Sequence, residues 1–195
     1  MDAPAAAEAA ALVLNLAYVA LAIVQSVWCW PAGFFGAALT LVVFVQARLY
    51  AAAVLQLGYM ALMVYGWYEW RRGGESGGGV QVSRTPRRFW IGLAVAGAAL
   101  AVPLGLFLAH RTDAALPAWD AGTTSFSLVA QFMTARKWIE TWLVWVLVDA
   151  VYVGMLVTQA LNLMAALYSI YIVMAIVGWV TWRRSLLGTL PGLAG

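Results

Sequence analysis

One stretch of the sequence combines the side chains that could do chemistry. Residues 136–152 read RKWIETWLVWVLVDAVY, so Glu140, Asp149 and three tryptophans lie in a segment that is apolar enough to enter a membrane. A carboxylate near the centre of a membrane helix costs about 2.5–3.5 kcal/mol on insertion scales. A partner or a ligand must offset that cost, which makes Asp149 the first candidate for a functional side chain.

The spacing of this segment places the acid and the aromatic rings on one helical face, because residues three, four and seven apart share a face. The face consists of Trp138, Trp142, Trp145, Asp149 and Tyr152. It is too polar at the acid to meet lipid and is expected to turn toward a cavity or a neighbouring helix. Tryptophan rings attract a flat cation with about 0.5–2 kcal/mol each, and the acid would add a counter-charge or accept hydrogen bonds from hydroxyl groups.

Packing alone is the alternative for these rings, with Asp149 bonded to a tyrosine or glutamine of a neighbouring helix. For Trp142 and Trp145 we favour a ligand role. For Trp138, near the cytoplasmic end, we favour a place in the interfacial aromatic belt. Glu140 lies in the first turn of the expected helix, beside Arg136 and Lys137, and is interpreted as structural.

Other expected membrane helices carry polar side chains that could join the same site. One stripe consists of Thr124, Ser127, Gln131 and Thr134. Its hydroxyls can bond to their own helix carbonyls, so the Gln131 amide is its better ligand candidate. The further candidates are Gln56, Tyr59, Tyr65, Tyr168 and Tyr171, with Asn15, Tyr18 and Gln25 on one face of the first helix. We expect about half of these residues only to hold helices together.

The composition identifies an integral membrane protein. The chain has 195 residues, of which 65% are hydrophobic and 10% charged, whereas soluble domains are about 45–50% apolar. The single cysteine excludes an internal disulfide. The first apolar stretch lacks a basic region before it, so a cleaved signal peptide is not expected.

The apolar stretches predict an all-α protein with seven membrane spans. They lie near 9–29, 32–48, 50–70, 89–109, 122–136, 138–157 and 161–182. The first two spans are separated at Trp30–Pro31.

The cations predict the orientation of these spans. With seven spans and a cytoplasmic C-terminus, nine of the eleven Lys and Arg residues fall on the inner side, and only Arg48 and Arg111 fall outside. This bias follows the positive-inside rule and places the N-terminus outside the cell. Because the basic residues lie beside helix ends, we interpret them as topology signals and headgroup contacts, and expect no nucleic-acid partner.

An internal repeat appears at a shift of 112 positions. Residues 49–72 and 161–184 align so that Tyr59 meets Tyr171, Gly66 meets Gly178, and both segments end in W-x-x-W-R-R. The third and seventh spans therefore correspond, which predicts two parallel three-helix bundles joined by one helix, a 3+1+3 arrangement. Parallel repeats are a recurrent transporter design, with the substrate between the halves. The predicted divisions are 1–72 for the first bundle, 73–121 for the linker and linking helix, 122–184 for the second bundle, and 185–195 for a flexible tail.

No pattern for catalysis, metal binding or a cofactor was found. His110 is the single histidine and lies at a helix end, and the glycine run at 73–79 lacks the Lys-Ser/Thr of a phosphate loop. Retinal needs a lysine deep in a helix, but the single lysine, Lys137, lies at a span boundary. We expect neither an enzyme nor a light-driven pump.

Several segments resemble, in order, the bacterial PnuC family of vitamin transporters. They are WCWPAG at 28–33, LYA at 49–51, YGWYEW at 65–70, WDAGTTSFSLVAQ at 119–131, RKWIETWLVW at 136–145, and LYSIY at 167–171. The resemblance implies a SWEET-like 3+1+3 fold, a homotrimer in the bacterial inner membrane, and facilitated diffusion of nicotinamide riboside driven by its phosphorylation inside the cell. It places the family's W-x-x-W motif on Trp142 and Trp145, against the pyridinium ring.

The sequence also departs from the family pattern. Ala52 and Thr141 stand where family members often have an acidic residue and asparagine. These departures put the particular vitamin in question, so thiamine or another B vitamin stays an alternative substrate. A seven-helix sensor or scaffold that does not transport is the alternative from a different class.

Overall fold

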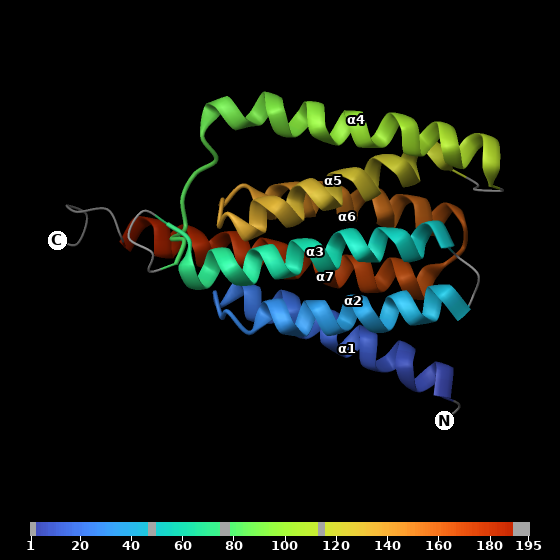
Figure 1. Ribbon diagram of the computed structural model, residues 1–195, viewed down its shortest axis with the longest axis horizontal. Helices are drawn as coiled ribbons and strands as arrows, with labels where there is room; N and C mark the ends of the chain where they lie inside the picture. Colours follow the sequence, from blue (N-terminus) through green and yellow to red (C-terminus); the bar gives the residue numbers. More distant parts are fainter. Residues whose placement is uncertain (1–2, 47–49, 75–78, 113–115, 189–195) are drawn as a thin grey trace. The chain divides into compact units, whose positions relative to one another are not determined.

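The computed structural model describes residues 3–46, 50–74, 79–112 and 116–188. Within these ranges the chain forms seven helices and one isolated β-bridge (Figure 1). The helices are α1 (Ala3–Ile23), α2 (Cys29–Gln46), α3 (Tyr50–Arg72), α4 (Arg87–Arg111), α5 (Pro117–Ala135), α6 (Thr141–Thr158) and α7 (Asn162–Gly188). The prediction of seven helices is confirmed.

Five of these helices, α1, α2, α4, α6 and α7, are long and apolar enough to cross a membrane. The other two are more polar. Helix α3 carries Gln56 and Glu69 and ends in an arginine pair, and α5 has 19 residues with a stripe of threonine and serine. The crossing of the membrane by α3 and α5 therefore stays a prediction.

The turn between the first two helices lies earlier than predicted. We placed the break at Trp30–Pro31, but α1 ends at Ile23 and both residues lie in the first turn of α2. Proline is tolerated there because the first turn of a helix has no partner for its backbone N–H. The chain reverses instead through residues 24–28, where Gln25 takes a left-handed conformation (φ 58°). Gln25 is thus in a turn and does not continue the helical face of Asn15 and Tyr18.

The chain divides into two compact units, Met1–Gln81 and Val82–Gly195. In the first unit α1 packs on α2 and α2 packs on α3. In the second unit α4 packs on α5, α5 on α6, and α6 on α7. Helix α4, the predicted linking helix, is thus part of the second unit and lies alongside α5 (Figure 1).

The predicted linker and tail differ in part from the structure. Gly74 and Gly79 both have positive φ (82° and 94°), as expected for a glycine-rich connection, while residues 75–78 lie outside the described residues. The predicted tail begins too early, because α7 continues to Gly188. Residues 189–195, and Arg48 among the predicted outer cations, also lie outside the described residues.

The two units repeat the same local structure at the shift of 112 positions. Gln25 and Lys137, 112 residues apart, both have positive φ (58° and 49°) in the turn before α2 and α6. Trp30 packs edge-on against Trp70 with ring centroids 5.3 Å apart and planes at 87°. The equivalent pair, Trp142 and Trp182, has the same separation, 5.3 Å, and an angle of 85°.

A glycine lies under the first ring of each pair. A Cβ atom on Gly66 would collide with Trp30, and one on Gly178 would collide with Trp142. The repeat therefore includes α2 and α6, and it fixes the packing of α2 on α3 and of α6 on α7.

Candidate functional site

Helix α6 positions the acid at its centre. Asp149 is the ninth of the 18 residues of Thr141–Thr158, and its side chain is 5% exposed. The helix begins after the left-handed turn at Lys137, so its aromatic and acidic face is directed by that turn and by the packing of α5 and α7 on either side. Asp149 is therefore enclosed by the protein, as expected for an acid within a membrane helix.

Tyrosines from α6 and α7 lie near this acid. Tyr152 and Tyr171 both lie close enough to Asp149 to interact with its charge. Tyr168 packs between them, with its ring centroid 4.7 Å from that of Tyr152 and 5.9 Å from that of Tyr171. The structure thus brings together three of the predicted site residues, Asp149, Tyr168 and Tyr171.

Tyr152 belongs to this group, although the sequence analysis placed it on the face without naming it a site residue. Its side chain lies near those of Thr123 and Thr124 on α5, and also near Asp120. Its position three residues after Asp149 was the sequence signal for it. We call Asp149, Tyr152, Tyr168, Tyr171 and Thr124 the acid–tyrosine cluster.

Trp145 extends this face by one turn toward the start of α6. The side chain is half-buried, and its indole N–H donates to Thr134 Oγ1 of α5 at 3.3 Å. Thr134 Oγ1 also lies 2.9 Å from Thr141 Oγ1, so α5 fixes the edge of the ring. The Trp145 indole is therefore held in one orientation, and part of the ring stays accessible.

Trp142 has a different environment. The side chain is 3% exposed and packs between Gly178 and the edge of Trp182. Among the described residues, its buried indole N–H has no hydrogen-bond partner, and the same is true of Trp30, its equivalent in the first unit. The first unit thus repeats the packing of Trp142, whereas Trp145 and Asp149 correspond to Gly33 and Ala37.

The polar stripe of α5 contains hydroxyls that are hydrogen-bonded to carbonyls of their own helix, and one buried amide. Ser127 donates to the Thr123 carbonyl at 2.7 Å, and Thr134 donates to the Ala130 carbonyl at 3.0 Å, as expected for hydroxyls inside a helix. Gln131 is fully buried. Thr124 lies near Tyr152 of α6.

Two further candidates, Gln56 and Tyr59, lie in the first unit. They are half-buried and three residues apart on α3, so they share a face of that helix.

Trp138 and Glu140 lie in the turn between α5 and α6 and pack or bond there. Trp138, predicted to open a helix at an interface, instead precedes α6 and is 4% exposed, packed against Phe89 and Phe132. This burial contradicts the assignment to an interfacial belt. Glu140 is structural as predicted, but through a partner that the sequence did not indicate: Glu140 Oε2 accepts from the Thr85 backbone N–H and hydroxyl at 2.8 and 2.9 Å.

Comparisons with known proteins agree with the arrangement of helices. The model of the family described as "Nicotinamide mononucleotide transporter" matches residues 5–184. The chain is similar to the nicotinamide riboside transporter PnuC of Escherichia coli (strain K12), with 25% identity over 91% of this chain and 85% of that protein. It is also similar to the riboflavin/roseoflavin transporter RibM of Streptomyces davaonensis, with 33% identity over 94% of this chain and 87% of that protein.

A solved structure has the same fold. The crystal structure of the vitamin B3 transporter PnuC superimposes with a TM-score of 0.73 at 19% identity, covering 94% of this chain and 83% of that one. The family match extends over nearly the whole chain, and the relatives are transporters rather than enzymes. The chain therefore belongs to the nicotinamide mononucleotide transporter family, a family of multi-pass membrane transporters.

Proposed function

We propose that this transporter carries nicotinamide riboside, held between the Trp145 ring and the acid–tyrosine cluster. The observation that supports this proposal is the buried side chain of Asp149 at the centre of α6, one turn from the half-buried indole of Trp145. A flat pyridinium cation can stack on the indole while Asp149 balances its charge. Tyr152, Tyr168 and Tyr171 supply hydroxyls for the ribose.

The predicted polar residues complete the proposed site. Thr124 and Ser127 of α5 border it beside Gln131, whose amide can bond to the carboxamide or the sugar. Gln56 and Tyr59 stay predicted substrate-binding residues of α3. Trp142 belongs to the predicted W-x-x-W pair, and we propose that it acts by supporting the backbone of α6 beneath the ligand, since Gly178 and Trp182 occupy its two sides.

We further propose that transport follows alternating access between two three-helix bundles, α1–α3 and α5–α7, with α4 as the linking helix. The repeated Trp30–Trp70 and Trp142–Trp182 pairs support this 3+1+3 organisation, since each would keep its bundle rigid. In the bacterial cytoplasmic membrane, the basic ends of α3 and α7 would face the cytoplasm and the N-terminus the outside. The assembly would be a homotrimer, and intracellular phosphorylation would make the uptake directional.

A flavin is the second candidate substrate, because RibM is 33% identical to this chain over 94% of its length. A neutral isoalloxazine ring could stack on Trp145 with its ribityl hydroxyls bonded to the acid–tyrosine cluster. Thiamine, which is cationic and has flat rings, stays a further alternative.

Binding and uptake measurements on the purified protein test these proposals. Isothermal titration with nicotinamide riboside, riboflavin and thiamine should give its strongest isotherm with nicotinamide riboside, and heat only with riboflavin would transfer the assignment to flavins. Proteoliposomes should equilibrate radiolabelled nicotinamide riboside without accumulating it, and should accumulate the label when a nicotinamide riboside kinase and ATP are enclosed. Binding without any uptake would indicate a sensor or scaffold.

A further inference from the structure

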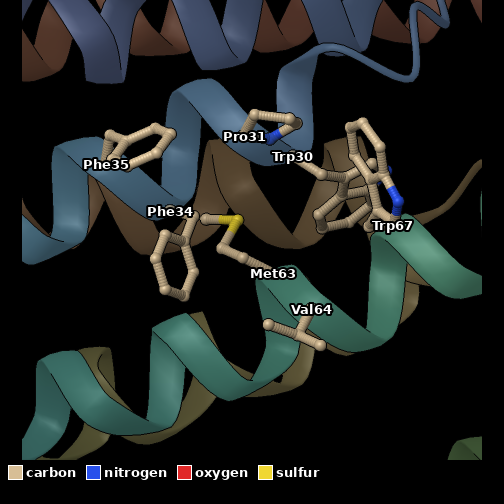
Figure 2. A pocket seen from close by; sticks show the side chains of 7 residues that line it. All are labelled: Trp30, Pro31, Phe34, Phe35, Met63, Val64 and Trp67. Atoms are coloured by element: carbon tan, nitrogen blue, oxygen red, sulfur yellow. The ribbon is translucent and has the colours of Figure 1, made fainter.

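The first unit has an apolar groove that the proposed vitamin site does not use (Figure 2). Its volume is about 270 Å³, slightly below the roughly 300–1,000 Å³ of small-molecule sites. The lining residues from α2 and α3 are Trp30, Pro31, Phe34, Phe35, Met63, Val64 and Trp67. Among the described residues, none that carries a charge, an amide or a hydroxyl lines the groove, so its chemistry suits a hydrocarbon and not a vitamin.

The groove lies where α2 and α3 approach each other closely. Gly33 is buried, and a Cβ atom there would lie 2.7 Å from the sulfur of Met63. The helices can therefore approach closely enough for Met63 to line the floor, while Phe35 and Val64 stand at the rim, 60% and 59% exposed. Methionine adapts its shape to irregular apolar partners.

One end of the groove has the side chains that mark a membrane–water interface. Trp67 lines that end, packs edge-on against the exposed Trp28 at 5.7 Å, and lies under the Arg71 guanidinium at 5.3 Å. Tryptophan and arginine gather at headgroup level, and arginine binds phosphate through several donors. From Trp67 the groove runs back along α3 to Met63, away from the arginines at the helix end.

We propose that this groove binds one acyl chain of an anionic phospholipid, with the lipid phosphate held by Arg71. The apolar lining of the groove suits the acyl chain. Arg71, at one end of the groove, suits the negatively charged headgroup. This lipid site requires that the protein lies in a membrane, as members of its transporter family do. It does not depend on which vitamin the protein carries.

Matched variants from the internal repeat test this site in the full-length protein. Val64→Trp fills the groove, and Ile176→Trp is its control, because Ile176 is the equivalent residue on α7 and is 51% exposed. Arg71→Gln removes the phosphate partner, with the equivalent Arg183→Gln as its control.

Native mass spectrometry should detect phosphatidylglycerol retained by the wild type. Arg71→Gln should weaken retention about fivefold, as expected for one basic residue at an anionic surface, Val64→Trp should abolish it, and the controls should behave as wild type.

A photoreactive acyl chain on phosphatidylglycerol gives a second readout that does not require a variant. The expected label falls on peptides containing Phe34, Phe35 or Met63, and competition by phosphatidylglycerol should exceed that by diacylglycerol or by glycerol phosphate alone. Label confined to other helices, or equal retention in Val64→Trp and wild type, would overturn the proposal. Dissociation of an oligomer by Val64→Trp with lipid retention unchanged would overturn it too, and would identify the groove as a contact between copies of the chain.

Discussion

Trp142 and Gly178 are in direct contact across α6 and α7. A Cβ atom built on Gly178 would lie 2.5 Å from Cε2 of the Trp142 ring, well inside ordinary van der Waals distance. The same relationship joins Trp30 and Gly66 in the first unit. Both indoles then meet a second tryptophan edge-on, so each unit contains one glycine-supported tryptophan pair.

Gly178→Ala is expected to destabilise the protein, because the added methyl group must displace a fully packed indole. Overpacking of this kind costs about 1–3 kcal/mol, more than the roughly 0.5–1 kcal/mol that alanine gains over glycine in a helix. The melting temperature of the detergent-solubilised protein should fall by several degrees, and Gly66→Ala should have the same effect. Gly154→Ala is the control, since a Cβ there meets nothing within 4 Å, and equal melting of all three variants would contradict the packing.

Trp145→Ala should weaken vitamin binding while Trp119→Ala should not. Loss of one stacking ring removes about 0.5–2 kcal/mol, which raises the Kd about twofold to thirtyfold. Trp119 is 60% exposed and provides a tryptophan control. Trp145→Phe keeps a ring but loses the bond to Thr134, and should fall between the two in isothermal titration. Wild-type affinity in Trp145→Ala would remove this residue from the site.

Asp149→Asn should distinguish a cationic substrate from a neutral one. The amide keeps the size of the side chain and can still bond to sugar hydroxyls, but it lacks the counter-charge. We expect the Kd for nicotinamide riboside to rise about tenfold or more, equivalent to about 1.4 kcal/mol, with a smaller change for riboflavin. An equal loss for both ligands would mean that Asp149 acts only through hydrogen bonds or through the fold.

Glu140→Ala should loosen the segment that leads from the first unit into α4. Thr85 donates two hydrogen bonds to this carboxylate. Two residues earlier, the backbone of Ser83 donates to the Lys137 carbonyl and accepts from the Ile139 N–H. Leaving such donors unpaired costs about 1–3 kcal/mol. The melting temperature should fall for Glu140→Ala and by less for Glu140→Gln. Thr158→Val, which removes only a bond to the Met155 carbonyl three residues earlier in its own helix, should leave it unchanged.

Lysine should replace Arg183 and Arg184 without loss of transport. Both side chains are exposed at the end of α7, and topology depends on positive charge rather than on the guanidinium fork. Uptake into proteoliposomes is the measurement, and a large loss would assign these residues to gating or to binding. The same expectation holds for Arg71 and Arg72, since lysine also binds phosphate as a point charge.

The periodicity of apolar and polar residues was sufficient to predict seven helices and to orient Asp149 away from lipid. Both follow from local geometry, because a 3.6-residue repeat fixes which side chains share a face and a carboxylate avoids hydrocarbon wherever its helix lies. The repeat was also detectable from Tyr59, Gly66 and Trp70 and their equivalents, since duplication preserves residue types at constant spacing.

Tertiary structure decided what each tryptophan does. Trp138, Trp142 and Trp145 have the same residue type and a helical spacing, yet the first packs in a turn, the second on Gly178, and the third bonds to Thr134 beside the acid. The left-handed turn at Lys137 ends the helical periodicity before Thr141, and the neighbouring helices determine which rings are enclosed. Spacing along one helix contains no information about those neighbours, so only the packed bundle separates the packing rings from the ring proposed to meet the vitamin.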